Sequence, residues 1–113
     1  MHELSLAGGI LRVLEQTRER DPFECITQLR LEVGALAGVE IESLRFALDA
    51  IAVNTVLAGA SIEIDQPPGS AWCLPCGRSV EITSRLDACP HCDGFQLQPT
   101  GGTELRVVDM QVI

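Results

Sequence analysis

Residues 73–92 read CLPCGRSVEITSRLDACPHC, and this stretch determines how the second half of the chain can fold. It holds two C-x-x-C pairs, Cys73 with Cys76 and Cys89 with Cys92, separated by twelve residues. Two such pairs supply four thiolates at the corners of a tetrahedron, the arrangement that Zn²⁺ prefers. A proline inside each pair and a glycine after it favour a backbone that turns its amides toward sulfur. The spacing therefore predicts a metal site, and soft thiolates favour zinc.

The surroundings of the cysteines indicate a structural zinc rather than a catalytic one. Residues 72–97 have few apolar side chains, so burial alone is a poor basis for folding them. Metal binding would substitute for the missing core, and four thiolates leave no open position for water. Two alternatives stay open: redox chemistry of the C-x-x-C pairs, and replacement of one thiolate by His91, otherwise an exposed loop residue. Cys25 is expected to be a small buried side chain.

The sequence before this insert alternates between helical and strand periodicity. Residues 4–18 place apolar side chains at helical spacing, and DPF at 21–23 ends that pattern. Residues 26–33, ITQLRLEV, alternate apolar and polar side chains and predict a half-buried strand. Residues 41–57 predict a second helix, and residues 61–65, SIEID, predict a second strand.

After the insert, residues 104–113, ELRVVDMQVI, predict a final strand. Its apolar positions change parity midway, which indicates a bulge or a strand covered on both faces. The expected fold class is α+β, with two helices on a three-stranded sheet. The expected domains are an α+β lobe from residues 1–67 and 100–113, and an inserted zinc-ribbon-like lobe with the four paired cysteines from residues 68–99.

Composition restricts the classes of function. Of the 113 residues, 46% are hydrophobic and only 4% aromatic, so the core must be aliphatic. A net charge of −8 disfavours both nucleic-acid phosphates and an anionic membrane as partners. No apolar run approaches the roughly 18 residues of a spanning helix, and no signal peptide is apparent, so we expect a cytoplasmic protein. The chain shows no nucleophile–base pair and no Gly-rich phosphate loop, so we expect it not to be an enzyme.

The chain begins MHELSL, and His2 and Glu3 stand ahead of the first helical pattern. A neutral imidazole, the neighbouring backbone nitrogens and the Glu3 carboxylate could form a planar, nitrogen-rich ligand set, which suits Ni²⁺ or Cu²⁺. A glutamate near a helix start is also favourable for the helix dipole alone. From these residues by themselves, both interpretations stay open.

Taken together, these features make the chain resemble the HypA/HybF family of nickel metallochaperones for [NiFe]-hydrogenase maturation. The resemblance rests on the MHE start, the segment LEVGALAGVEIESLRFALD at 31–49 and the paired C-x-x-C insert, in that order over essentially the whole chain. It implies that His2 and Glu3 bind Ni²⁺ for transport, with Glu40 as a further carboxylate ligand. It also implies that a structural Zn²⁺ is bound by the four thiolates of Cys73, Cys76, Cys89 and Cys92.

The resemblance also implies the partners, which are a HypB-type nickel-binding GTPase and the large subunit of a [NiFe]-hydrogenase. Because some family members serve urease, urease accessory proteins are further candidates, and the chain is expected to be a monomer or a homodimer. The nickel site requires that Met1 is retained, since His2 would otherwise be the terminal residue. The alternative function is a zinc-ribbon module that binds protein or nucleic acid and transports no metal.

Overall fold

The computed structural model describes residues 2–113, which form two compact units. The first unit comprises the residues up to Leu31, Val39–Ile64 and Val107–Ile113, and the second comprises Glu32–Gly38 and Asp65–Arg106. The elements in chain order are α1 (His2–Arg20), β1 (Ile26–Val33), α2 (Ile41–Ala52), β2 (Ser61–Asp65), β3 (Gly69–Cys73), β4 (Arg78–Ile82), β5 (Leu97–Gly101) and β6 (Leu105–Val112). No helix within residues 2–113 is both long and apolar enough to cross a bilayer.

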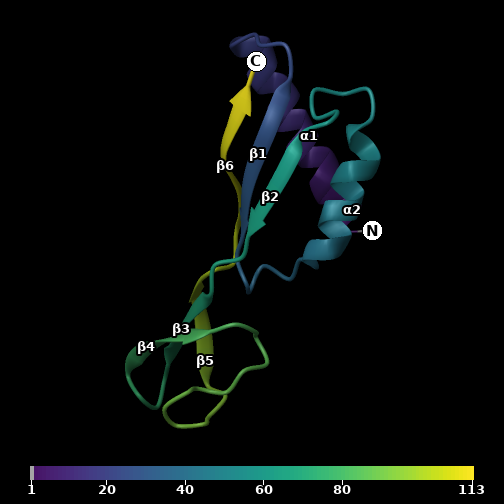
Figure 1. Cartoon of the computed structure of the whole chain (residues 1–113). Helices are drawn as coiled ribbons and strands as arrows, with labels where there is room; N and C mark the ends of the chain where they lie inside the picture. The colour runs from purple at the N-terminus through teal and green to yellow at the C-terminus, as the bar shows by residue number, and fades with distance from the viewer. Residues whose placement is uncertain (1) are drawn as a thin grey trace. The chain divides into compact units, whose positions relative to one another are not determined.

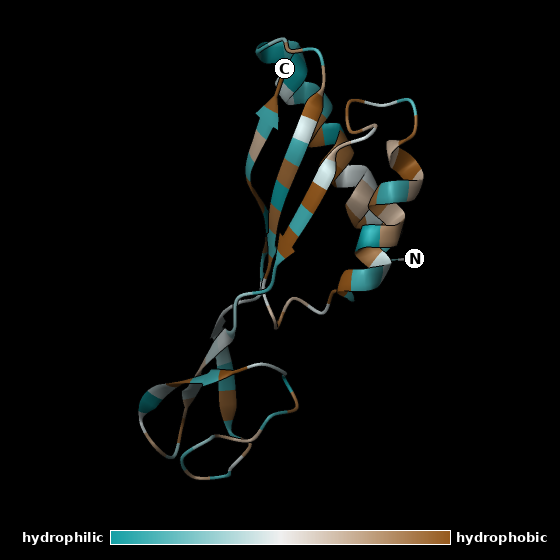
Figure 2. Ribbon diagram, viewed as in Figure 1, coloured by the Kyte–Doolittle hydropathy of each residue, from teal (hydrophilic) through white to brown (hydrophobic). Residues whose placement is uncertain are grey.

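The first unit confirms the predicted α+β layer pair. Its strands form one sheet in the order β2-β1-β6, and Figure 1 shows α1 and α2 packed together on one side of that sheet. Alternation along β1 decides which side the helices cover, as the colouring of Figure 2 shows. Leu29, Leu31 and Val33 are fully buried, whereas Arg30 and Glu32 lie between them on the other face, together with Gln28.

Polar pairs fill the face of this sheet that the helices leave uncovered. The Gln28 side-chain amide donates to Glu63 at 3.0 Å. Arg30 donates twice to the Asp109 carboxylate, at 2.9 and 2.6 Å, and so ties β1 to β6. This pairing lowers the pKa of the Asp109 carboxyl. The sheet thus has one aliphatic face and one face of cross-strand polar contacts.

The second helix is shorter than its apolar periodicity predicts. It ends at Ala52 instead of continuing to residue 57, because Val53 leaves the helical conformation with ψ 127° and Asn54 then takes a left-handed one with φ 61°. The Thr55 hydroxyl then donates to the Ala52 carbonyl at 2.6 Å and satisfies one of the last helical acceptors. Val56 and Leu57 are buried nonetheless. Their apolar side chains, which the spacing predicted to form a further helical turn, therefore come from the turns after the helix.

The final strand, β6, lies beside β1 in the sheet of the first unit. Beyond one end of the pair, Cys25 and Ile113 exchange backbone hydrogen bonds, and beyond the other end the Gly34 amide donates to the Glu104 carbonyl. The amides of Glu24 and Cys25 both donate to the Ile113 carbonyl, at 2.7 and 3.4 Å, so two residues before β1 face one residue after β6. The bulge or two-sided cover predicted for β6 itself stays a prediction. Val107 and Val108, where the parity changes, are both half-buried.

The second unit contains a sheet that the sequence did not predict, in the order β4-β3-β5. β3 pairs antiparallel with both neighbours, and Trp72 lies opposite Ser79 on one side and Gln98 on the other. Ala71 and Cys73 point inward, whereas Trp72 is 42% exposed.

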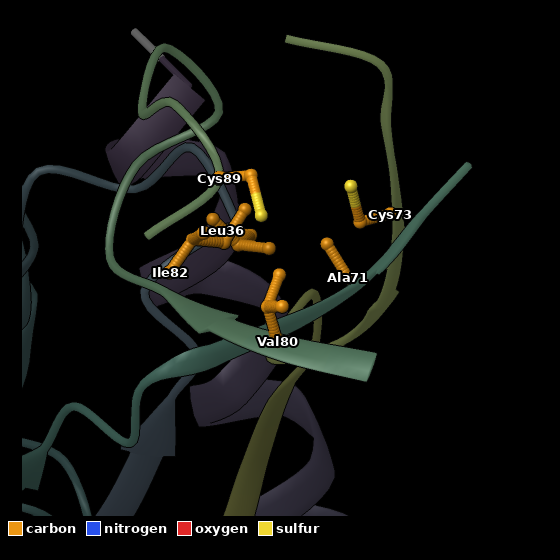
Figure 3. Packing of buried hydrophobic residues seen from close by; sticks show 6 residues of the cluster. All are labelled: Leu36, Ala71, Cys73, Val80, Ile82 and Cys89. Atoms are coloured by element: carbon orange, nitrogen blue, oxygen red, sulfur yellow. The ribbon is translucent and has the colours of Figure 1, made fainter. Parts of the chain in front are cut away.

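A small core holds this second unit together. Its buried members are Leu36, Ala71, Cys73, Val80, Ile82 and Cys89, which Figure 3 shows as one cluster. Leu36 comes from the loop after β1, where its amide donates to the Gly102 carbonyl at 2.8 Å. A side chain at Gly34 would collide with the backbone of Gly102, so this close approach requires glycine. Two of the six core residues are thus cysteines of the predicted metal site.

Candidate metal centres

The four predicted zinc ligands lie on two turns with the same backbone construction. The Gly77 amide donates to the Cys73 carbonyl at 2.9 Å, and the Asp93 amide donates to the Cys89 carbonyl at 2.9 Å. The residue after each pair is left-handed, with φ 62° at Gly77 and 59° at Asp93. A glycine was expected in this role after both pairs, which is wrong for the second turn, because Asp93 directly follows that pair and Gly94 comes after it. Aspartate is among the few side chains that adopt this conformation readily.

The sulfur atoms of these turns form one cluster. All four lie within 4.8 Å of one another, with Cys73 Sγ 3.7 Å from Cys92 Sγ and Cys76 Sγ 3.9 Å from Cys89 Sγ. These separations are far longer than a disulfide bond of about 2.05 Å. A tetrahedral zinc with bonds of about 2.3 Å would place its sulfurs about 3.8 Å apart. The donor set therefore fits a four-coordinate metal with all positions filled by protein.

The clustered thiols change one another's acidity. The pKa of the Cys89 thiol is lowered to about 7: burial acts to raise it, but the amides of Cys92 and His91 and the neighbouring thiols outweigh that effect. The pKa of Cys76 is raised to about 12 by hydrogen bonding with Cys73 and Cys92 and by burial. The Cys89 thiol thus ionises more readily than the Cys76 thiol. Four thiolates at this spacing need a central positive charge.

His91 lies beside the cluster and outside it. Its side chain is exposed, as predicted, and its Nε2 is close to the Arg78 guanidinium. Its contribution to the cluster is its backbone amide, which donates to Cys89 Sγ at 3.4 Å. Cys25 is half-buried rather than buried, because it lies at the end of β1 opposite the chain terminus.

The predicted nickel residues come together at the start of α1, in the first unit. His2 is exposed, and its Nδ1 lies 3.5 Å from Oε2 of Glu3. The same Glu3 oxygen accepts from the backbone amide of Glu40 at 3.3 Å. Hydrogen bonds from the backbone amides of Glu40 and of Glu3 itself lower the pKa of the Glu3 carboxyl. An anionic carboxylate is thereby fixed next to an accessible imidazole. Met1 lies outside the described residues.

Glu40 has a structural role at this position. It is the N-cap of α2, and its Oε2 accepts from the Ser43 amide at 2.5 Å. Its carboxylate therefore satisfies a helix amide, while its backbone amide holds Glu3. Within residues 2–113, the four cysteines are the only His, Cys, Asp or Glu side chains whose ligand atoms form a gathered cluster of three or more. The amino-terminal site thus has two neighbouring side-chain donors rather than a preformed cage.

Comparison with known proteins matches the whole chain to one family. Residues 1–112 match the family model described as "Hydrogenase/urease nickel incorporation, metallochaperone, hypA". The chain is 56% identical over 112 residues to the hydrogenase maturation factor HypA of Polaromonas naphthalenivorans, covering 99% of this chain and 97% of the relative. It is 58% identical over 112 residues to that of Cupriavidus necator, covering 99% and 94%.

Solved structures agree with the fold. The solution structure of the Ni metallochaperone HypA from Helicobacter pylori superposes with a TM-score of 0.69 at 15% identity, covering 98% of this chain and 97% of that one. A second solution structure of a HypA protein gives 0.68 at 18% identity, covering 100% and 97%. At these identities the likeness concerns the arrangement of the elements.

Proposed function

The chain belongs to the HypA family of nickel metallochaperones for hydrogenase maturation, and from that premise we propose that it binds one Ni²⁺ at its amino terminus and delivers it to the large-subunit precursor of a [NiFe]-hydrogenase. The resemblance read from the sequence is confirmed by these matches. The members of this family that the chain matches are maturation factors, and we propose that this chain likewise catalyses no reaction.

The proposed nickel ligands are the His2 imidazole, the backbone nitrogens beside it and the Glu3 carboxylate. One observation supports this proposal above the others: Glu3 is held by the Glu40 amide while its carboxylate stays next to the exposed His2 ring. Nitrogen-rich sets of this kind suit Ni²⁺. Glu40 is the further carboxylate of the proposed site, and to reach the metal it would release the Ser43 amide.

The second proposed metal is a structural zinc at Cys73, Cys76, Cys89 and Cys92. Bound there, zinc would neutralise the thiolates and complete the small core that Cys73 and Cys89 enter. With four protein ligands the site would be closed to water, so it would serve folding rather than transport. A thiolate site also requires reduced cysteines, which supports a cytoplasmic location.

We propose two protein partners, a HypB-type nickel-binding GTPase and the hydrogenase large-subunit precursor. Urease accessory proteins are further candidates, because the family model covers nickel incorporation into both hydrogenase and urease. GTP hydrolysis would belong to the GTPase partner. The chain itself would act as a monomer or a homodimer.

A calorimetric titration with Ni²⁺ tests the nickel site. The wild-type protein should bind one equivalent, and His2→Ala should lose that binding. His91→Ala is the matched control, since it removes the only other histidine of the chain, which is also exposed. It should bind nickel as the wild type does, and all three proteins should contain equal zinc by elemental analysis. Wild-type stoichiometry and affinity in His2→Ala would refute the assignment.

A further inference from the structure

Aromatic side chains of this protein lie at the surface rather than in the core. The chain has three phenylalanines, one tryptophan and no tyrosine. Phe46 is 75% exposed, Phe95 73% and Trp72 42%, and Phe23 is half-buried. Leucine, isoleucine, valine and alanine fill the core instead. Aromatic residues are enriched in protein–protein interfaces and dominate their binding energy, so an exposed phenylalanine in the middle of a helix indicates a contact surface.

Phe46 forms one wall of a groove between the start of α1 and the exposed side of α2. The cavity has a volume of about 490 Å³ and lies entirely within the first unit. We call it the Phe46 groove, and it is lined by Glu3, Leu4, Glu42, Ser43, Phe46, Ala47 and Ala50. Leu4, itself 44% exposed, is a second large apolar side chain there, and the two alanines leave room between them. Among the described residues that line it, the two carboxylates are the only charged groups.

We propose that the Phe46 groove docks a segment of a partner protein that carries an apolar side chain flanked by arginine or lysine. This proposal rests on the proposed function, because Glu3 belongs both to the groove and to the nickel site. The apolar walls would take the partner's apolar side chain, as grooves that bind amphipathic helices do. Glu3 and Glu42 would pair with the flanking cations, and no basic side chain of residues 2–113 lines the groove to repel them.

The same observations disfavour other occupants. Pockets for small ligands usually bury 70–90% or more of the ligand surface. A groove with a wall as exposed as Phe46 is too open to enclose a small ligand to that extent. A second copy joined through the same groove would bring Glu3 and Glu42 of both chains together, and like charges at an interface are repulsive. An anionic membrane would meet the same carboxylates.

Docking in this groove would place the partner beside the nickel cargo. The Glu3 carboxylate that lines the groove lies 3.5 Å from the His2 imidazole. A partner that engages Phe46 would therefore cover the amino terminus and compete for Glu3. The groove would thus couple recognition of the partner to release of the metal, without a change elsewhere in the fold.

Binding of the purified GTPase and of the purified hydrogenase large-subunit precursor to zinc-loaded protein tests the proposal. Phe46→Ala should weaken binding to at least one of them about tenfold or more, as expected for an interface hot spot. Phe95→Ala is the matched control, because it makes the same substitution at nearly the same exposure in the other unit, and it should bind as the wild type does. Glu42→Gln should weaken binding and reduce its dependence on salt.

A nickel titration of Phe46→Ala separates docking from cargo binding, and this variant should retain the wild-type stoichiometry. Unchanged binding of both partner proteins by Phe46→Ala would overturn the groove proposal. An equal loss of partner affinity in Phe95→Ala would overturn it too. The proposal would also fail if Phe46→Ala lost nickel binding together with partner binding. It would fail as well if partner binding by Glu42→Gln kept the salt dependence of the wild type. If the wild-type protein binds neither partner, the groove proposal fails, while the titration with His2→Ala still decides the nickel function.

Discussion

Leu36→Ala should weaken zinc binding, although Leu36 precedes Cys73 by 37 residues and is no ligand. Its side chain is only 2% exposed and belongs to the six-residue core that also contains Cys73 and Cys89. A side chain at Gly69 would collide with Leu36, which shows how closely the leucine fills its site. Replacing a buried leucine with alanine costs about 2–5 kcal/mol, and we expect about 3 kcal/mol here.

This cost should appear as lost zinc affinity, because zinc binding and folding of this unit are one coupled equilibrium. Since about 1.4 kcal/mol corresponds to a factor of ten, the apparent dissociation constant should rise about a hundredfold. Competition with a chromophoric chelator measures it directly. Leu86→Ala is the control, because Leu86 lies in the same unit and is 86% exposed, so its zinc affinity should not change. Equal affinities in the two variants would show that the core and the metal site are independent.

Three further predictions concern stability. Gly8→Ala should raise the free energy of unfolding by about 0.5–1 kcal/mol, because the added Cβ meets open space on a helix. Gly34→Ala should lower the free energy of unfolding by more than that, because its Cβ would collide with the backbone of Gly102. Thermal unfolding measures both changes, and changes of the same sign would contradict the reasoning. The Arg30 pair lowers the pKa of Asp109, so its stabilisation is complete above the ordinary value of 3.8 and is lost as pH falls through the lowered value. The stability difference between the wild type and Asp109→Asn should therefore shrink in acid, and a constant difference would exclude the pair as its cause. Removing zinc with a chelator should abolish amide protection within residues 65–106 while α1 keeps its protection, and a uniform loss would indicate a single cooperative unit.

The sheet of the first unit could be predicted because its signal is local. The bounds of β1 and β2 match the expected 26–33 and 61–65, since alternation defines each strand and turn residues bound it. The end of α2 could not be predicted from periodicity, because Val56 continues the apolar spacing. What ends the helix is the backbone turn at Val53 and the left-handed Asn54, which apolar spacing does not record.

The sheet of the second unit could not be predicted because its causes are distant in sequence. β3, β4 and β5 have five residues each and few apolar side chains, so their alternation carries little information. Their pairing depends on the cysteine cluster and on Leu36, which arrives from the loop after β1. The ligand positions were nonetheless clear, because thiol spacing along two short turns is itself the chemical signal.

The amino-terminal site lies between these cases. The chemistry of His2 and Glu3 suggested a metal only weakly, and the resemblance to a family made it specific. The contact of Glu3 with the Glu40 amide joins residues far apart in the chain, so no pattern near either residue could predict it. The exposure of Phe46 could not be predicted either. An apolar residue in a helix is expected to be buried, and only the position of the neighbouring helix shows that Phe46 is not.

Trp72 gives this protein a built-in optical probe of one unit. It is the only tryptophan, tyrosine is absent, and it lies on β3 in the unit that holds the cysteines. Fluorescence excited selectively in tryptophan therefore originates entirely from the second unit, so the response of this unit to nickel binding at the amino terminus can be measured without a label. A shift in that emission on adding Ni²⁺ would report communication between the two metal centres, and a constant emission would report their independence.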